Sequence, residues 1–78
     1  MNKTLFNIYM IKNHETQKTL AEAMGIAQSA LSDRINGKTE FRQNEINFIR
    51  RRWGLSDQEV VDIFFTEEVS KEDTEKGA

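Results

Sequence analysis

Three glycines divide a chain without proline into short segments of helical character. The apolar residues recur at the 3.6-residue spacing of an α-helix, and most positions between them hold good helix formers. Gly25, Gly37 and Gly54 each stand where such a run ends, since glycine readily adopts the left-handed conformation that stops a helix. With 78 residues, the chain can build only one small core. The pattern predicts a single all-α domain.

Five helices are expected from this spacing. The predicted ranges are about 4–13, 17–24, 28–36, 43–53 and 57–65. Thr16 is the expected N-cap of the second helix, and Ser56 with Glu59 forms the S-x-x-E pattern of a capping box before the fifth. The first helix is expected to be largely buried, because Phe6 and Ile11 widen its apolar stripe.

The composition excludes several classes of function. The chain has no cysteine and a single histidine, which argues against disulfides, thiol chemistry and the usual zinc sites. No grouping of nucleophile, base and phosphate-binding loop is present, so we expect no enzyme activity, no cofactor and no small-molecule substrate. No apolar run approaches the roughly 20 residues that span a bilayer, and no signal peptide is apparent. We therefore expect a cytoplasmic protein without membrane contact.

The charge is unevenly distributed along the chain. A net charge of -2 is unfavourable for nucleic-acid binding, because lysine and arginine neutralise the phosphates. Residues 66–78, however, hold five acids and two lysines and carry -3, which leaves +1 for residues 1–65. We expect a helical domain over residues 1–65 and a flexible acidic tail over residues 66–78. Any binding to DNA would depend on where individual cations lie.

Residues 16–38 have the organisation of a helix-turn-helix, with two short helices joined by a glycine turn. Ala21 is small enough for the helix at 28–36 to cross close to the helix at 17–24, and Gly25 permits the tight bend between them. Leu20 and Leu31 are expected to lock the two helices at a fixed angle. The outer face of the helix at 28–36 carries short side chains that form hydrogen bonds, which suits the major groove of DNA.

This segment resembles the helix-turn-helix of the lambda-repressor and Cro superfamily, also called the XRE family. The resemblance extends to residue 65 through Leu31, Ile35-Asn36-Gly37-Lys38, Glu40-Phe41, Glu45-Ile46, Gly54-Leu55-Ser56 and Ile63-Phe64-Phe65. These motifs are most similar to short phage-encoded repressor or Cro-like members. The resemblance implies a compact four- to five-helix domain that binds double-stranded operator DNA, usually as a homodimer.

The resemblance also assigns the residues that would contact DNA through a recognition helix at about 28–36. The implied base contacts are Gln28, Ser29, Ser32, Asp33 and Asn36. The implied contacts to the DNA backbone are Gln17, Lys38, Arg42, Gln43 and Asn44. Gln28 is the strongest candidate, because a glutamine at the start of such a helix can pair bidentately with adenine.

Apolar residues are in surplus on the last helix. They cover more of its circumference than one core contact needs, so we expect Val61 and Phe65 to form a self-complementary dimer interface.

Three positions depart from the family pattern. Ala27 and Arg42 stand where a capping residue is usual, and Arg34 stands at a position that is apolar in many members.

His14 is expected to cap carbonyl groups at the end of the first helix. The run of arginines at positions 50–52 is expected to be a solvated surface.

A second function remains open beside DNA binding. The near-neutral charge and the acidic tail also fit a protein-interaction module of the same fold, such as an antitoxin or an antirepressor.

Overall fold

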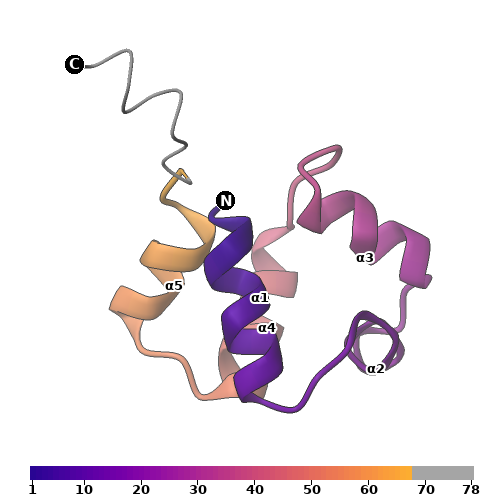
Figure 1. Cartoon of the computed structure of the whole chain (residues 1–78), viewed down its shortest axis with the longest axis horizontal. Helices are drawn as coiled ribbons and strands as arrows, with labels where there is room; N and C mark the ends of the chain where they lie inside the picture. Colours follow the sequence, from indigo (N-terminus) through magenta and orange to yellow (C-terminus); the bar gives the residue numbers. More distant parts are fainter. Residues whose placement is uncertain (68–78) are drawn as a thin grey trace.

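Five helices make up the part of the chain that the computed structural model describes, residues 1–67 (Figure 1). They are α1 (Lys3–Lys12), α2 (Gln17–Met24), α3 (Gln28–Ile35), α4 (Gln43–Trp53) and α5 (Asp57–Phe64). No strand occurs among these 67 residues. The all-α prediction is confirmed, and the helix limits differ from the predicted ones by about one residue. The predicted tail lies outside the described residues from position 68 onward.

The predicted caps begin and end the helices. The hydroxyl of Thr16 accepts the Thr19 N–H at 3.1 Å, and the hydroxyl of Ser56 accepts the Glu59 N–H at 3.1 Å. The Ser56 N–H donates in return to the Glu59 carboxylate at 2.8 Å, which completes the capping box. Gly25 and Gly54 adopt left-handed conformations with φ of 73° and 63°.

The end of α1 differs from the prediction. His14 stops the helix with its backbone, which adopts a left-handed φ of 58°, and its N–H donates to the Ile11 carbonyl at 2.9 Å. The following N–H, from Glu15, donates to the Met10 carbonyl at 2.8 Å, as in a Schellman motif. The side chain that caps a carbonyl is Asn13, which donates to Tyr9 O at 2.7 Å. The imidazole makes no hydrogen bond to residues 1–67, so the predicted role of His14 is wrong in that respect.

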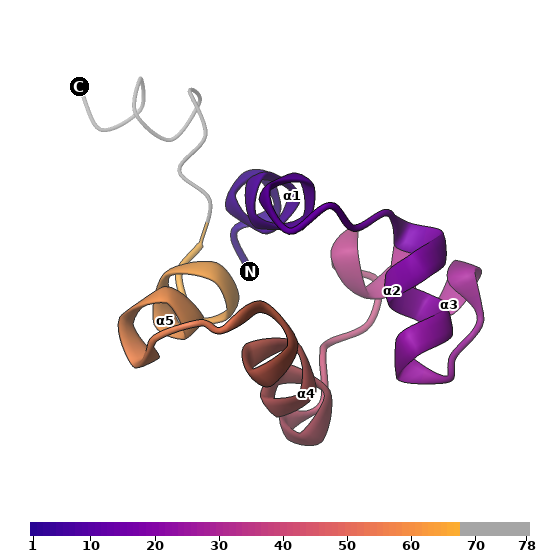
Figure 2. The ribbon, with the colours of Figure 1, turned by 90° about the horizontal axis from the view of Figure 1, so that it is seen from below.

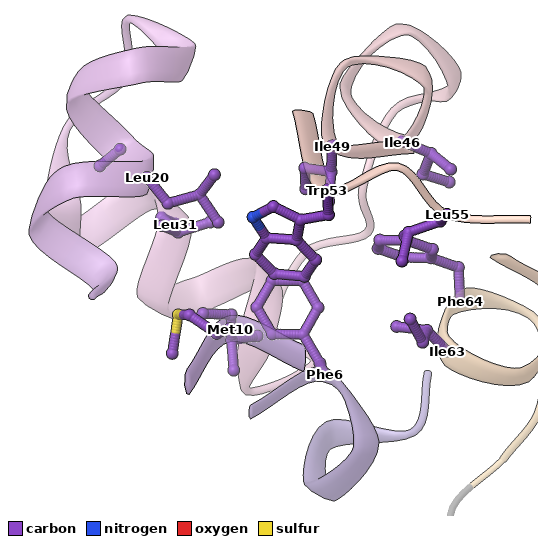
Figure 3. Close-up of a cluster of buried hydrophobic side chains, with 12 residues drawn as sticks. Phe6, Met10, Leu20, Leu31, Ile46, Ile49, Trp53, Leu55, Ile63 and Phe64 are labelled. Atoms are coloured by element: carbon purple, nitrogen blue, oxygen red, sulfur yellow. The ribbon is translucent and has the colours of Figure 1, made fainter. Parts of the chain in front are cut away.

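One apolar core receives side chains from all five helices (Figure 3). Its buried members are Phe6, Met10, Leu20, Ala21, Leu31, Ile35, Ile46, Ile49, Trp53, Leu55, Ile63 and Phe64. The ring of Phe6 lies 5.3 Å from that of Trp53, 5.6 Å from that of Phe41 and 5.9 Å from that of Phe64, measured between centroids. Phe6 therefore joins α1 to α4, α5 and the loop that precedes α4.

The prediction that α1 is largely buried is wrong. Only Phe6 and Met10 are buried in this helix, while Ile8 is 52 % exposed and Ile11 is 71 % exposed. At 100° per residue, positions 6 and 10 share the inner face, and positions 8 and 11 fall on the opposite one. A surface helix buries one stripe, so Leu5 and Tyr9 are only partly buried against the core, and Ile8 and Ile11 face solvent.

The first residues of the chain lie against α5. The Asn2 N–H donates to the Ile63 carbonyl at 2.8 Å, and the Tyr9 hydroxyl donates to the Glu59 carboxylate at 2.7 Å. This hydrogen bond from its hydroxyl to Glu59 raises the pKa of Tyr9 above its ordinary value.

In Figure 2, α2 and α3 form a separate pair at the end of the molecule opposite α5. No helix within residues 1–67 is long and apolar enough to cross a membrane.

Candidate nucleic-acid interface

The pair formed by α2 and α3 has the geometry of a helix-turn-helix (Figures 1 and 2). Leu20 and Ala21 on α2, and Leu31 on α3, are buried between the pair and the rest of the core. Ala21 is 2 % exposed, so a longer side chain there would displace its neighbours. The bend is closed by the Ile26 N–H, which donates to the Ala21 carbonyl at 3.1 Å. The expected packing of Leu20, Ala21 and Leu31 between the two helices is thus confirmed.

The outer face of α3 carries the five residues implied as base contacts. Gln28 and Ser29, at its first turn, are exposed, and Ser32 and Asp33 are half-buried one turn later. Asn36 is the exposed C-cap. Within residues 1–67, the side chains of Gln28 and Ser29 make no hydrogen bond, so their donors and acceptors are available to a ligand. Ala27 is the N-cap of α3 and supplies no side-chain hydrogen bond, because the side chain of alanine has no polar atom.

A chain of hydrogen bonds ends the exposed face of α3. The Asn36 amide nitrogen donates to the Ser32 hydroxyl at 3.2 Å, and the Lys3 ammonium donates to the Asn36 amide oxygen at 2.7 Å. Lys3 was not among the residues predicted from the sequence. It lies 33 positions from Asn36 in the chain, and no local pattern relates the two residues.

An ion pair connects α3 to the start of α4. Arg34 donates from Nε to the Glu45 carboxylate at 2.9 Å, and both side chains are largely buried, at 13 % and 11 % exposed. The same carboxylate oxygen accepts the Arg42 N–H at 2.8 Å, which caps α4. The Arg42 side chain has only donors and cannot cap the helix itself. Glu45 therefore fixes the first turn of α4 relative to α3.

The residues implied as backbone contacts lie on three segments near the α2–α3 pair. Lys38 is exposed in the loop after α3, and its N–H donates to the Asp33 carbonyl at 2.9 Å. Arg42, Gln43 and Asn44 are exposed at the start of α4, next to the Arg34–Glu45 pair. Gln17 is the half-buried first residue of α2.

A second ion pair holds the start of α2 against the end of α4. Glu15 is buried and accepts hydrogen bonds from Arg52, from the Thr19 hydroxyl at 2.6 Å and from the Trp53 indole at 3.4 Å. The Arg52 guanidinium holds the pKa of Glu15 below its usual value, and the bonds from Thr19 and Trp53 act in the same direction against the effect of burial. The α2–α3 pair is therefore attached to both ends of α4. Glu45 in the first turn of α4 pairs with Arg34, and Arg52 in its last turn pairs with Glu15.

The arginine run at positions 50–52 is exposed, as predicted, but two of its members also form ion pairs. Arg52 pairs with Glu15, and Arg50 pairs with Asp57 at the start of α5. The sequence analysis did not foresee either pair.

The outer face of α5 leaves apolar surface uncovered. Val61 is 45 % exposed and Phe65 is 61 % exposed, whereas Ile63 and Phe64 are buried. Beside Phe65 lies a cleft of about 440 Å³, lined in part by Met1 and Phe41. The predicted surplus of apolar side chains on this helix is therefore present.

The comparisons with known proteins agree with this geometry. A family profile described as helix-turn-helix matches residues 9–51, which is more than half of the chain and contains the end of α1, all of α2 and α3, and most of α4. No curated protein and no solved structure gives a significant match. The chain belongs to the XRE-type helix-turn-helix family, the family of the lambda repressor and Cro, and is a DNA-binding regulator of that type.

Proposed function

We propose that this protein is a sequence-specific transcriptional regulator of the repressor or Cro type, encoded by a temperate phage or prophage. It acts sterically, by occupying an operator with α3 in the major groove. The observation that carries the proposal is the exposed first turn of α3, where Gln28 and Ser29 have no partner within residues 1–67. The similarity of residues 16–65 to short phage-encoded members supports the finer assignment.

The proposed base contacts lie along the outer face of α3. Gln28 would pair bidentately with adenine, and Ser29 and Ser32 would bond base edges. Asp33 would accept from the amino group of cytosine, and Asn36 would contact the last base of the half-site.

The proposed backbone contacts come from the segments that flank α3. Lys38 and Arg42 would neutralise phosphates, and Gln17, Gln43 and Asn44 would donate hydrogen bonds to phosphate oxygens. The N–H groups at the starts of α2 and α4 would assist, since the positive end of a helix dipole favours anions. Local placement of donors would thus offset the charge of only +1 over residues 1–65.

Two substitutions test the division between base and backbone contacts. Gln28→Ala is expected to lower the preference for a duplex selected from random DNA over a scrambled duplex by about tenfold. One bidentate pair between a side chain and a base discriminates against the wrong base by about 1–3 kcal/mol. Lys38→Ala is expected to weaken binding to all duplexes alike and to reduce the slope of log affinity against log salt by about 0.9. Fluorescence anisotropy would measure both effects, using a duplex selected from random DNA and a scrambled duplex over a range of salt concentrations.

Arg51→Ala is the matched control for Lys38→Ala. It also removes one exposed positive charge, but from the last turn of α4, so the affinity for DNA should change little. Unchanged DNA binding in both Gln28→Ala and Lys38→Ala would contradict the assignment of α3 to the groove. A wild-type chain that binds no duplex but binds a protein would favour the antitoxin or antirepressor function.

We also propose that the protein binds its operator as a homodimer through Val61 and Phe65. Phe65→Glu is expected to abolish dimerisation, because it places a charge in a self-complementary apolar contact. Ile11→Glu, at another exposed apolar residue, serves as the control and should leave the dimer intact. Analytical ultracentrifugation with and without DNA makes the measurement, and a wild-type chain that stays monomeric in both conditions contradicts the proposal.

A further inference from the structure

We infer that Lys3 orients the amide of Asn36 and thereby helps to determine which DNA sequence is bound; this inference rests on the proposed function. The observation behind it is the pair of hydrogen bonds from Lys3 to Asn36, at 2.7 Å, and from Asn36 to Ser32, at 3.2 Å. Lys3 is a positioning residue in this scheme. It acts through Asn36 and does not itself contact a phosphate.

The chemistry of the two bonds fixes the amide in one of its two orientations. A lysine ammonium has donors only, so the atom of Asn36 that faces Lys3 must be the amide oxygen. The amide nitrogen then faces Ser32, whose hydroxyl oxygen accepts. One N–H of the Asn36 amide remains available to a base, and the Ser32 hydroxyl keeps its own proton to donate. The face of α3 therefore presents a defined set of donors in its last turn.

The backbone on both sides of this contact is firmly held. The Asn2 N–H donates to Ile63 O at 2.8 Å, and the Asn2 side chain accepts the Leu5 N–H at 3.0 Å as the N-cap of α1. Asn36 is the C-cap of α3, and its own N–H donates to Ser32 O at 2.9 Å. The contact itself is exposed, so its loss should affect the fold little.

Without Lys3, the Asn36 amide would be free to flip in the unbound protein. DNA binding would then have to order this side chain, at a cost that depends on the base to be contacted. Ordering one side chain corresponds to a loss of about threefold to tenfold in affinity. The loss should appear for the selected site, where Asn36 bonds a base, and should be absent for a scrambled duplex.

The test compares Lys3→Met with Lys12→Met on the selected and scrambled duplexes. Lys3→Met keeps the aliphatic stem and should lower the ratio of the two affinities by about threefold to tenfold, with the salt slope unchanged. Lys12 lies on the same helix with its ammonium 5.2 Å from the centroid of the Tyr9 ring, and its replacement should leave the ratio unchanged. Lys3→Arg keeps a donor and should retain most of the discrimination. In an Asn36→Ala background, Lys3→Met should cause no further loss.

Each alternative has a distinct result. An equal loss on both duplexes, with a salt slope lower by about 0.9, would show a phosphate contact and overturn the inference. An unchanged ratio in Lys3→Met, or an additive loss in the Asn36→Ala background, would also overturn it while leaving the proposed function intact. A wild-type chain that prefers no duplex would contradict the proposed function and the inference together.

Discussion

Phe6→Ala is expected to destabilise the domain by about 3–5 kcal/mol, the usual loss for a buried phenylalanine. The Phe6 side chain is fully buried, and its ring contacts those of Phe41, Trp53 and Phe64. The cavity left by alanine would be lined by three rings from separate segments, none of which could move inward without losing other contacts. A domain of this size has a total stability of about 5–15 kcal/mol or less, so much of the population would unfold.

Urea denaturation followed by circular dichroism would measure this loss. Ile11→Ala is the matched control, because it removes an apolar side chain of the same helix that is 71 % exposed. Its effect should stay within about 0.5 kcal/mol. Comparable destabilisation in both variants would mean that α1 packs through a different face from the one described.

Local signals in the sequence predicted most of the fold. The glycines at positions 25, 37 and 54 and the caps at Thr16 and Ser56 each act within a few residues of the chain, and all five end or begin a helix. These features depend on backbone conformation and neighbouring hydrogen bonds, which a short stretch of sequence specifies.

The burial of α1 could not be predicted in the same way. Its apolar residues surround the helix, so the spacing alone does not say which stripe faces the core. The choice is made by the partners of the helix, since Phe6 and Met10 meet the other helices and Ile11 does not. Only tertiary packing resolves such a case.

The polar contacts that hold the candidate interface were also beyond the sequence. Lys3 and Asn36, or Glu15 and Arg52, are separated by 33 and 37 residues, and nothing local connects them. Glu45 is an exception, because it stands three residues after Arg42 at the spacing of a capping box. That spacing would have predicted the cap, although not the bond from Arg34.

Arg52→Met is expected to destabilise the domain by about 2–3 kcal/mol near neutral pH. The Glu15 side chain is 6 % exposed and would remain as a buried carboxylate without its cation. Removal of one member of a fully buried pair costs about 3–5 kcal/mol, and the loss here is smaller because Arg52 is 39 % exposed and Thr19 and Trp53 still donate to the carboxylate. Weakened attachment of α2 to α4 should accompany the loss.

The effect of Arg52→Met should depend on pH with a definite sign. The pKa of Glu15 in the folded protein lies below its usual value of 4.5, so the pair stabilises the fold fully above the unfolded pKa. This contribution is lost as the pH falls through the folded pKa, where the carboxyl takes up a proton. The difference in stability between the wild type and Arg52→Met should therefore be largest near pH 7 and should shrink below about pH 4.

Arg50→Met provides the matched control for this prediction. Arg50 pairs with Asp57, whose side chain is 85 % exposed, so the loss should be about 0–1 kcal/mol. Urea denaturation of the three proteins between about pH 7 and pH 3 would give the comparison. A loss in Arg52→Met that persists unchanged at the acid end would attribute the effect to the packing of the arginine stem, because a charge on Glu15 can act only where that carboxyl is ionised.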